Sequence, residues 1–291
     1  MFETVLLPTD FSPDSQKVLA YVKDIPGTKK VVLYHVVDAT RPSLRGWEHG
    51  PKIENAKILL DENRQVLERD GREAHVVVEV IVDPVTQGTV PLAILNKAEA
   101  CHVSLIMMGA RGRNTIREIL LGSVSAGVVR SARIPVLLMR FPPGTAATGT
   151  RLGLFSRILV PVDFSDLSRN AFSHIPKNPV PEKVILLHVV DKGESEDEIQ
   201  AAVGDAREKL AAMEKDPALA GLSVTSLVHV GYPPDDIVAT ADREDVTMIL
   251  MSPQGEGWAR ELRTLFLGST TNAVVRRASR PVLITAGDRA G

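Results

Sequence analysis

Glycines, arginines and a serine gather in the segment "GARGRNTIREILLGS" at 109–123. Glycine lets a ligand approach the main chain closely, and successive exposed N–H groups form a concavity that binds anions. Gly122 and Ser123 directly precede "VSAGVVRSA", an amphipathic stretch expected to be a helix, and free N–H groups at a helix start favour a phosphate. Arg111, Arg113 and Arg117 add positive charge nearby. The segment therefore predicts a phosphate-binding turn.

A simpler interpretation of the same residues stays open. Gly109 and Gly112 could form only a turn from a strand into a loop, and Ser123 could only cap the helix. The spacing of the glycines does not by itself choose between the two.

A second polar group, "PTDFS" at 8–12, follows the first apolar run of the chain. A carboxylate such as that of Asp10, at the carboxyl end of a strand, can accept hydrogen bonds from ribose hydroxyls. The alternative for Asp10 or Ser12 is an N-cap of the following helix. The two roles can coexist on adjacent residues.

The elements that must position these residues alternate along the chain. Helical spacing is expected between short runs rich in Val, Ile and Leu, at about 13–24, 52–70, 90–101 and 123–131. The apolar runs lie at about 3–8, 30–37, 74–82, 103–109 and 134–140, and again at 157–162, 183–190, 223–230, 246–252 and 281–285. Near-continuous apolar strands separated by helices predict a parallel sheet covered on both faces.

The pattern occurs twice, which indicates a tandem duplication. "TVLLPTDFSPDS" at 4–15 resembles "RILVPVDFSDLS" at 157–168, and "VVLYHVVD" at 31–38 resembles "VILLHVVD" at 184–191. Between the copies, "FPPGTAATGTRLG" has the composition of a flexible linker. We predict two doubly wound five-stranded α/β domains of Rossmann-like type, at 1–141 and 155–291, joined by a linker at 142–154.

Composition excludes several classes of protein. A formal net charge of -2 gives no basic field for nucleic acid, so no nucleic-acid partner is expected. No apolar run approaches the roughly 20 residues that cross a bilayer, so no membrane association is expected, and the opening lacks the basic start of a signal peptide. The single cysteine, Cys101, fits a reducing compartment. We expect a cytoplasmic protein.

Taken together, these separated segments make the chain resemble a tandem universal stress protein. The family's nucleotide signature, Gly-x2-Gly-x9-Gly-Ser/Thr, is intact as Gly109, Gly112, Gly122 and Ser123. "LLPTDFS" and "LYHVVDA" are similar to the family's first strand with its turn and to its second strand. The resemblance covers nearly the whole chain in two copies. It implies ATP binding by the first copy, since the ATP-binding branch of the family keeps this signature.

The resemblance also implies roles for single residues. Pro8, Thr9 and Asp10 would lie around adenine and ribose, and Val36, which would otherwise read as a core valine, would lie at the adenine. Mg²⁺ or Mn²⁺ would be carried on the phosphates rather than by a protein site, since hard cations prefer oxygen and water ligands. The residues expected to contact ATP are Pro8, Thr9, Asp10, Val36, Gly109, Arg111, Gly112, Gly122, Ser123 and Val124.

The second copy departs from the signature. Ser252 replaces Gly109, Pro253 has no N–H to donate, and Val162 replaces Thr9. Twelve residues separate Gly255 from Gly268, whereas nine separate Gly112 from Gly122 in the first copy. We expect this copy to bind nucleotide weakly or not at all and to be mainly structural, although the longer loop could fit another ligand. Its weak candidates are Asp163, Val189, Gly255, Gly268 and Ser269.

Other chemistry finds little support in the sequence. The seven histidines lack the spacing of metal ligands, and His35 and His188 are expected to be buried, hydrogen-bonded strand residues. Neither a Gly-x4-Gly-Lys-Ser/Thr loop nor a Gly-x-Ser-x-Gly elbow is present. We nominate no catalytic residue and expect at most slow ATP hydrolysis.

The sequence therefore indicates a stress-response regulator that binds ATP in its first domain. One alternative is a chaperone-like or interaction scaffold that works without nucleotide, and another is an adenylating enzyme of the wider adenine-nucleotide α-hydrolase-like group. The resemblance implies that the fifth strands of the two domains pair within the chain as a pseudo-dimer. A homodimer and further protein partners are compatible with the sequence, which does not identify them.

Overall fold

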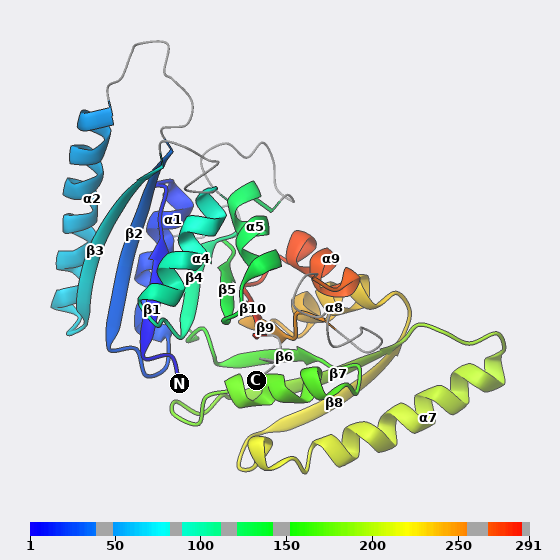
Figure 1. Cartoon of the computed structure of the whole chain (residues 1–291). Coiled ribbons are helices and arrows are strands. Elements are labelled where there is room, and N and C mark those ends of the chain that lie inside the picture. The colour runs from blue at the N-terminus through cyan, green and yellow to red at the C-terminus, as the bar shows by residue number, and fades with distance from the viewer. Residues whose placement is uncertain (39–48, 82–88, 112–120, 142–151, 255–266, 287–291) are drawn as a thin grey trace. The chain divides into compact units, whose positions relative to one another are not determined.

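The computed structural model of the chain separates into two compact units, Met1–Met139 and Arg140–Gly291, which are described individually (Figure 1). The structure describes residues 1–38, 49–81, 89–111, 121–141, 152–254 and 267–286. The predicted linker 142–154 lies largely outside these ranges. Leu154, at its end, is buried.

The first unit alternates strands and helices as predicted. One prediction differs, because the expected helix 13–24 ends early and a 3-10 turn at Val22–Asp24 follows the junction residue Tyr21. The elements in chain order are β1 (Thr4–Pro8), α1 (Pro13–Ala20), β2 (Lys30–Asp38), α2 (His49–Arg69), β3 (Glu73–Ile81), α4 (Val90–Ala100), β4 (Leu105–Gly109), α5 (Ser123–Ser131) and β5 (Val136–Met139).

The strands of the first unit form a parallel sheet in the order β3-β2-β1-β4-β5, which confirms the predicted fold class. Strand β1 is central, and its Leu6 pairs with Val32 of β2 on one side and Ile106 of β4 on the other. The order of connection reverses between β1 and β4. In open parallel sheets this reversal leaves a crevice beyond the carboxyl ends of the strands.

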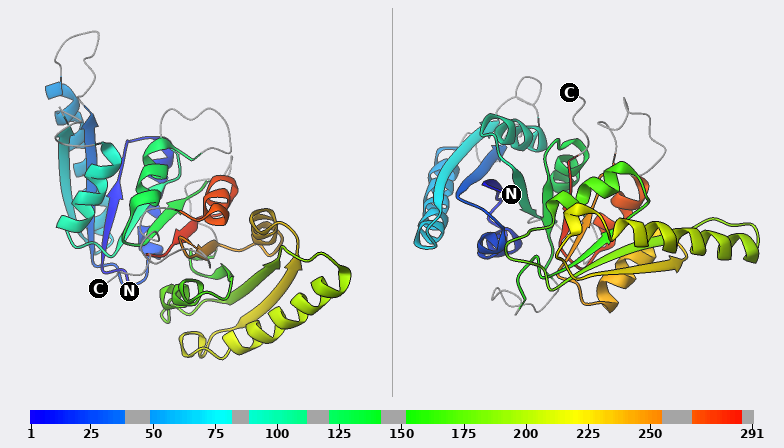
Figure 2. Two further views of the ribbon diagram at one scale, coloured as in Figure 1. Left: turned by 45° about the vertical axis from the view of Figure 1, so that its right-hand side comes forward. Right: turned by 90° about the horizontal axis from the view of Figure 1, so that it is seen from below.

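Helices cover both faces of this sheet, so the strands are apolar on both sides. Helices α4 and α5 pack on each other over one face, whereas α1 and α2 lie on the opposite face (Figure 2). Helix α2 buries a stripe formed by Ala56, Leu60 and Leu67, at spacings of four and seven residues. Every residue of β4 is buried.

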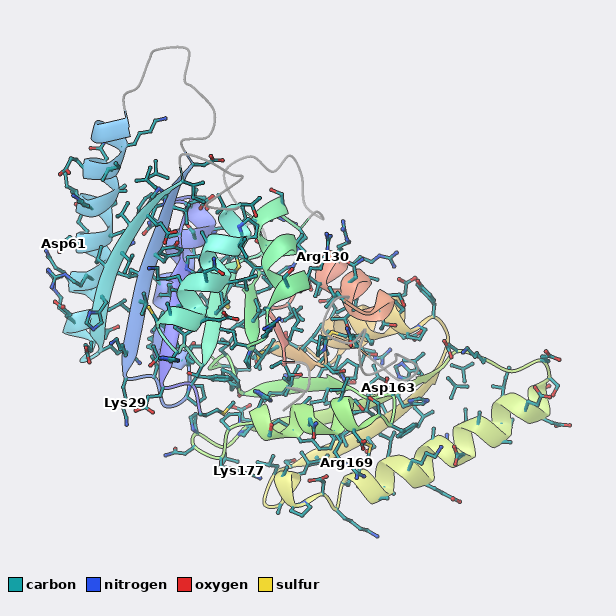
Figure 3. All side chains as sticks on the ribbon, viewed as in Figure 1. Lys29, Asp61, Arg130, Asp163, Arg169 and Lys177 are labelled. Carbon is teal, nitrogen blue, oxygen red and sulfur yellow. The ribbon has the colours of Figure 1, made fainter. Side chains whose placement is uncertain are left out.

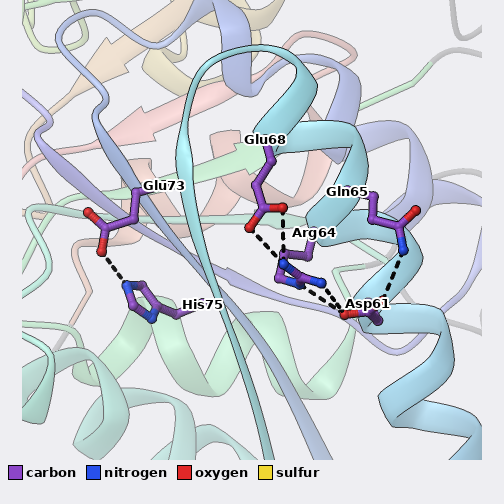
Figure 4. Close-up of polar contacts among 6 residues, drawn as sticks. All are labelled: Asp61, Arg64, Gln65, Glu68, Glu73 and His75. Carbon is purple, nitrogen blue, oxygen red and sulfur yellow. Dashed lines mark hydrogen bonds and ion pairs between the residues drawn. The ribbon is translucent and has the colours of Figure 1, made fainter.

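Charged side chains occupy the exposed faces, as Lys29 and Asp61 illustrate (Figure 3). On the solvent side of α2, the Arg64 guanidinium lies 2.7 Å from the carboxylate of Asp61 and 2.8 Å from that of Glu68 (Figure 4). These spacings of three and four residues place opposite charges on one helical face. The network supports α2 locally and takes no part in a cavity.

The second unit repeats the same architecture. Its sheet order is β10-β9-β6-β7-β8, the equivalent of the order in the first unit, which confirms the duplication. Short 3-10 turns occur at Ala171–His174 and Pro217–Leu219. The other elements are β6 (Arg157–Pro161), α6 (Asp166–Asn170), β7 (Lys183–Val190), α7 (Glu196–Met213), β8 (Val224–Val230), α8 (Pro233–Arg243), β9 (Met248–Met251), α9 (Ser269–Arg277) and β10 (Val282–Ile284).

Within the described ranges, the helices are too short or too polar to cross a membrane.

A close approach between α4 and α5 gives a prediction about stability. A methyl group at Gly127 of α5 would lie 2.7 Å from Cγ of Pro91, so Gly127→Ala should lower the free energy of unfolding by about 1–3 kcal/mol. Gly204→Ala is the matched control, because Gly204 lies inside α7 with no heavy atom within 4 Å of the added methyl. It should raise the free energy of unfolding by about 1 kcal/mol through helix propensity. Denaturant unfolding measures both, and stabilisation by both variants would contradict the close packing.

Candidate functional site

A cavity of about 420 Å³ opens at the carboxyl ends of β1, β2 and β4 in the first unit, at the reversal of the strand order. The described residues predicted to contact a ligand all line it: Pro8, Thr9, Asp10, Val36, Gly109, Arg111, Gly122, Ser123 and Val124. Gly112, like Arg113 and Arg117, lies outside the described residues. The lining also includes residues that were not predicted as ligand contacts, namely Ser15, Tyr34, His35, Val90, Ile94, Met108 and Ser125.

The turn after β1 is fixed by its own side chains. The Thr9 hydroxyl accepts the N–H of Phe11 at 3.1 Å and donates to Oγ of Ser15 at 3.1 Å. Oδ1 of Asp10 accepts the N–H of Ser12 at 3.0 Å. Phe11 has a left-handed φ of 58°, a conformation that is uncommon for a bulky residue. These bonds hold the turn in a shape that its backbone alone would disfavour.

The N-cap of α1 is Ser12, whose hydroxyl accepts the N–H of Ser15 at 3.2 Å. Asp10 therefore does not cap the helix. Its carboxylate braces the turn through one oxygen and also lines the cavity. This arrangement places a hydrogen-bond acceptor at the cavity wall, as ribose recognition requires.

His35 is a structural residue. Its Nδ1 lies 2.7 Å from the carbonyl oxygen of Thr9, and because a carbonyl only accepts, Nδ1 carries the proton. The imidazole also packs on the ring of Phe11, with centroids 4.6 Å apart. His188 and Phe164 repeat the pair in the second unit, where Nδ1 lies 2.9 Å from the carbonyl oxygen of Val162. The hydrogen bonds match the expectation for both histidines, but both imidazoles are half-buried rather than buried.

The first turn of α5 forms the polar end of the cavity. The N–H of Gly122 donates to the Ala110 carbonyl at 2.9 Å, and the Ser125 hydroxyl donates to the Gly109 carbonyl at 3.0 Å. Gly122, the N-cap, has no side chain to cap the helix, so the N–H groups of Ser123 and Val124 have no acceptor within the helix. The helix dipole adds partial positive charge there, and Arg111 lines the same end.

The two described glycines of the signature differ in what surrounds them. A Cβ on Gly109 would lie 3.2 Å from the carbonyl oxygen of Arg111, so the chain itself favours glycine there. A Cβ on Gly122 would have its nearest neighbour, the carbonyl oxygen of Ala110, at an ordinary 3.5 Å, and φ at Gly122 is -63°. Packing therefore gives a reason for glycine at 109, whereas neither packing nor φ requires a glycine at 122. A ligand that needs close approach to the main chain would explain Gly122.

The opposite end of the cavity is apolar. Val36 from β2 and Met108 from β4 meet Val90 and Ile94 from α4 there, and Tyr34 closes it from β2. Burial, followed by a hydrogen bond to the carboxylate of Glu79, raises the pKa of Tyr34 far above its ordinary value. The phenol is therefore neutral, and this end of the cavity suits a flat, largely apolar group.

The second unit keeps the frame of the site. The N–H of Gly268 donates to the Pro253 carbonyl at 2.8 Å, and the Thr271 hydroxyl donates to the Ser252 carbonyl at 3.0 Å. Ser269 begins α9, as Ser123 begins α5. The start of α9 is thus fixed in the same way as the start of α5.

The surroundings of that frame differ in the second unit. Ser252 places a side chain where Gly109 has none, and its hydroxyl donates to the Gln254 carbonyl at 2.8 Å. Gln254 and Val189 are buried, whereas their counterparts Arg111 and Val36 are half-buried. Asp163 (Figure 3) accepts hydrogen bonds from both the N–H and the hydroxyl of Ser165. Gly255 lies outside the described residues.

The described residues hold no cluster of three or more His, Cys, Asp or Glu side chains that could bind a metal ion. Of the described residues lining the cavity, Asp10 is the one with a carboxylate. Any cation in this cavity would thus take most of its ligands from a bound anion or from water.

Comparison with known proteins gives consistent matches. The model of the universal stress protein family matches residues 1–140 and 154–286. A crystal structure of a universal stress protein from Archaeoglobus fulgidus is 28% identical with a TM-score of 0.71, over 98% of this chain and 97% of that chain. Universal stress protein MJ0577 of Methanocaldococcus jannaschii is 29% identical over 156 residues, 45% of this chain and 94% of its own length. A universal stress protein of Synechocystis is 27% identical over 141 residues.

The turn after β1 gives a second prediction. Thr9→Val should lower the free energy of unfolding by about 1 kcal/mol, because the N–H of Phe11 loses its acceptor. Thr9→Ser keeps the hydroxyl and should stay close to the unchanged chain, which denaturant unfolding would measure. Unchanged stability in Thr9→Val, or a loss in Thr9→Ser as large as that in Thr9→Val, would contradict a specific role for the hydroxyl.

Proposed function

Because the chain belongs to the universal stress protein family, we propose that its first domain binds ATP and that the protein acts as a nucleotide-dependent regulator of a stress response. The domain boundaries that go with this proposal are 1–141 for the nucleotide-binding domain and 155–291 for the second domain. The cytoplasm is its proposed compartment, in keeping with the single cysteine.

One observation carries the proposal: the two ends of the cavity have opposite chemistry. The apolar end, formed by Tyr34, Val36, Val90, Ile94 and Met108, suits a base. The other end presents the N–H groups at the start of α5, which suit a phosphate tail.

Groups between these ends fit the rest of a nucleotide. Asp10 offers a carboxylate to ribose hydroxyls, and Arg111 offers positive charge to phosphates. The cavity volume of about 420 Å³ lies in the usual range of small-molecule sites. A ligand with a base, a ribose and an anionic tail would find apolar, carboxylate and N–H partners among the residues that line the cavity.

Mg²⁺ or Mn²⁺ would enter with the phosphates. The Ser123 hydroxyl and the main-chain groups near it are compatible with a cation held mainly by phosphate oxygens and water. Such a cation would neutralise the charge of the phosphate tail. Asp10, the one described carboxylate of the lining, already accepts the Ser12 N–H, so its Oδ1 is engaged in holding the turn after β1. Hydrolysis is thus proposed to be slow at most.

The second domain is proposed to bind nucleotide weakly or not at all. Ser252 carries a side chain where Gly109 has none, and Gln254 is buried where Arg111 is half-buried. Val162 also lacks the hydroxyl that Thr9 contributes to its turn. We propose further that this domain pairs with the first through the fifth strands. Whether whole chains also associate as a homodimer would be measured by light scattering.

Matched glycine variants test the proposed site. Gly122→Val should weaken ATP binding by about 10- to 100-fold, because a side chain at the N-cap separates the phosphates from the main-chain N–H groups. Gly268→Val, at the equivalent place in the second domain, should leave both the affinity and a stoichiometry of one ATP per chain unchanged. Isothermal titration measures both.

Two results would contradict the proposal. Tight ATP binding by Gly122→Val would remove the role of α5 in holding the phosphates. If stress-related activity in cells survives in a Gly122→Val chain that no longer binds ATP, the scaffold alternative is favoured over nucleotide-dependent regulation.

A second variant asks whether Ser252 alone disables the second domain. Gly109→Ser should fold, because the serine hydroxyl can donate to the Arg111 carbonyl as Ser252 donates to Gln254. It should also weaken ATP binding by about tenfold, since the side chain enters the polar end of the cavity. Thermal unfolding with and without ATP measures both effects. Unchanged affinity would mean that Ser252 alone does not disable the second domain, and Gln254 would be the next residue to test.

A further inference from the structure

Tyr34 joins three elements beneath the apolar end of the cavity. It lies in β2 and is fully buried. Its hydroxyl lies 2.7 Å from a carboxylate oxygen of Glu79 in β3 and 3.4 Å from the Ala93 carbonyl in α4. Both groups can only accept, so the single phenolic proton is donated mainly to the nearer Glu79 carboxylate, and the Ala93 carbonyl is a second, longer contact of the same hydroxyl. The proton is therefore engaged within the protein, and Tyr34 is one of the residues that line the cavity.

An ion pair outside the cavity completes this contact. Nζ of Lys97 in α4 lies 3.7 Å from the same oxygen of Glu79 and 5.7 Å from the centre of the Tyr34 ring. The Glu79 side chain is 40% exposed, so its charge is solvated even without the phenol. The hydrogen bond thus joins β2 to β3, the ion pair connects the same carboxylate to α4, and loss of the phenol leaves no buried charge.

The same helix provides the wall opposite the sheet. Val90 and Ile94 of α4 line the apolar end, and Ile94 directly follows Ala93, whose carbonyl the phenol approaches. A small shift of α4 relative to β2 would change the distance between Ile94 and Val36. The contact of Tyr34 with α4 therefore acts on the width of this end of the cavity.

The second unit lacks the link. Leu187 pairs with Pro161 just as Tyr34 pairs with Pro8, so Leu187 stands in the equivalent position. A leucine fills space but has no hydroxyl. The link is thus confined to the unit whose site is proposed to take a nucleotide.

We propose that Tyr34 is a positioning residue of the nucleotide site, which sets the width of the compartment for the base by tying α4 to β2 and β3 through its hydroxyl. This inference rests on the proposed function. Its consequence is selective, because the phosphates contact α5 and the turn after β4 rather than α4. Loss of the hydroxyl should weaken recognition of the base and leave recognition of the phosphates unchanged.

The test compares two ligands on the full chain. Kd is measured for ATP and for inorganic tripolyphosphate, which has no base, by displacement of a fluorescent ATP analogue. Tyr34→Phe should weaken ATP binding about fivefold with the Kd for tripolyphosphate unchanged. Glu79→Ala, a change at a partly exposed side chain, should reproduce this result, and Glu79→Gln should restore ATP affinity because its amide oxygen accepts the phenolic proton.

Tyr21→Phe is the matched control, since Tyr21 is also buried but does not line the cavity. It should change neither Kd. Unchanged ATP affinity in Tyr34→Phe, or an equal loss for both ligands, would overturn the positioning role alone. Failure of the unchanged chain to bind ATP would overturn the proposed function and this inference with it.

Discussion

The site depends on one constraint, the attachment of the first turn of α5 to the end of β4. Two hydrogen bonds make this attachment, from the Gly122 N–H to Ala110 and from the Ser125 hydroxyl to Gly109. These bonds engage the donors nearest the strand, so the next N–H groups of the helix remain available at the cavity. Because β4 is buried along its whole length, it gives the start of the helix a rigid support. A cluster of main-chain donors is thus positioned without any charged side chain of its own.

The same attachment in the second domain shows that the frame and its use are separable. Gly268 and Thr271 make the equivalent bonds at the start of α9. The residues around these bonds differ. Ser252 stands in place of Gly109, and the buried Gln254 stands in place of the half-buried Arg111. Duplication therefore gave two copies of one scaffold, which differ in the side chains around the start of the last helix.

The sequence predicted the parts of the fold that repeat or alternate. Apolar runs placed the strands, and the duplicated segments placed both domains. The glycine spacing and "PTDFS" pointed to residues that the structure brings together at one cavity. These features were visible because each has a local reason, such as a turn, a cap or a run of buried residues.

The rest of the cavity had no local signal. Val90, Ile94 and Tyr34 look like ordinary core residues, and only the crossing of α4 over β2 brings them to the site. The one available hint was topological, since a helix leading into β4 must begin at the carboxyl edge of the sheet. Ser15 was missed for a different reason, because its hydroxyl serves the turn after β1 and looks like a capping residue.

The close approach at Gly127 has an evolutionary consequence. The equivalent residue of α9 is Ala273, so the final helix of each domain is fitted to a different spacing from its neighbour. Transplanting α5 and its preceding turn into the second domain would therefore leave a gap beside α8, and the reverse exchange would force α4 outward. The last helices of the two halves are therefore not freely exchangeable, even where a grafted segment carries every signature residue.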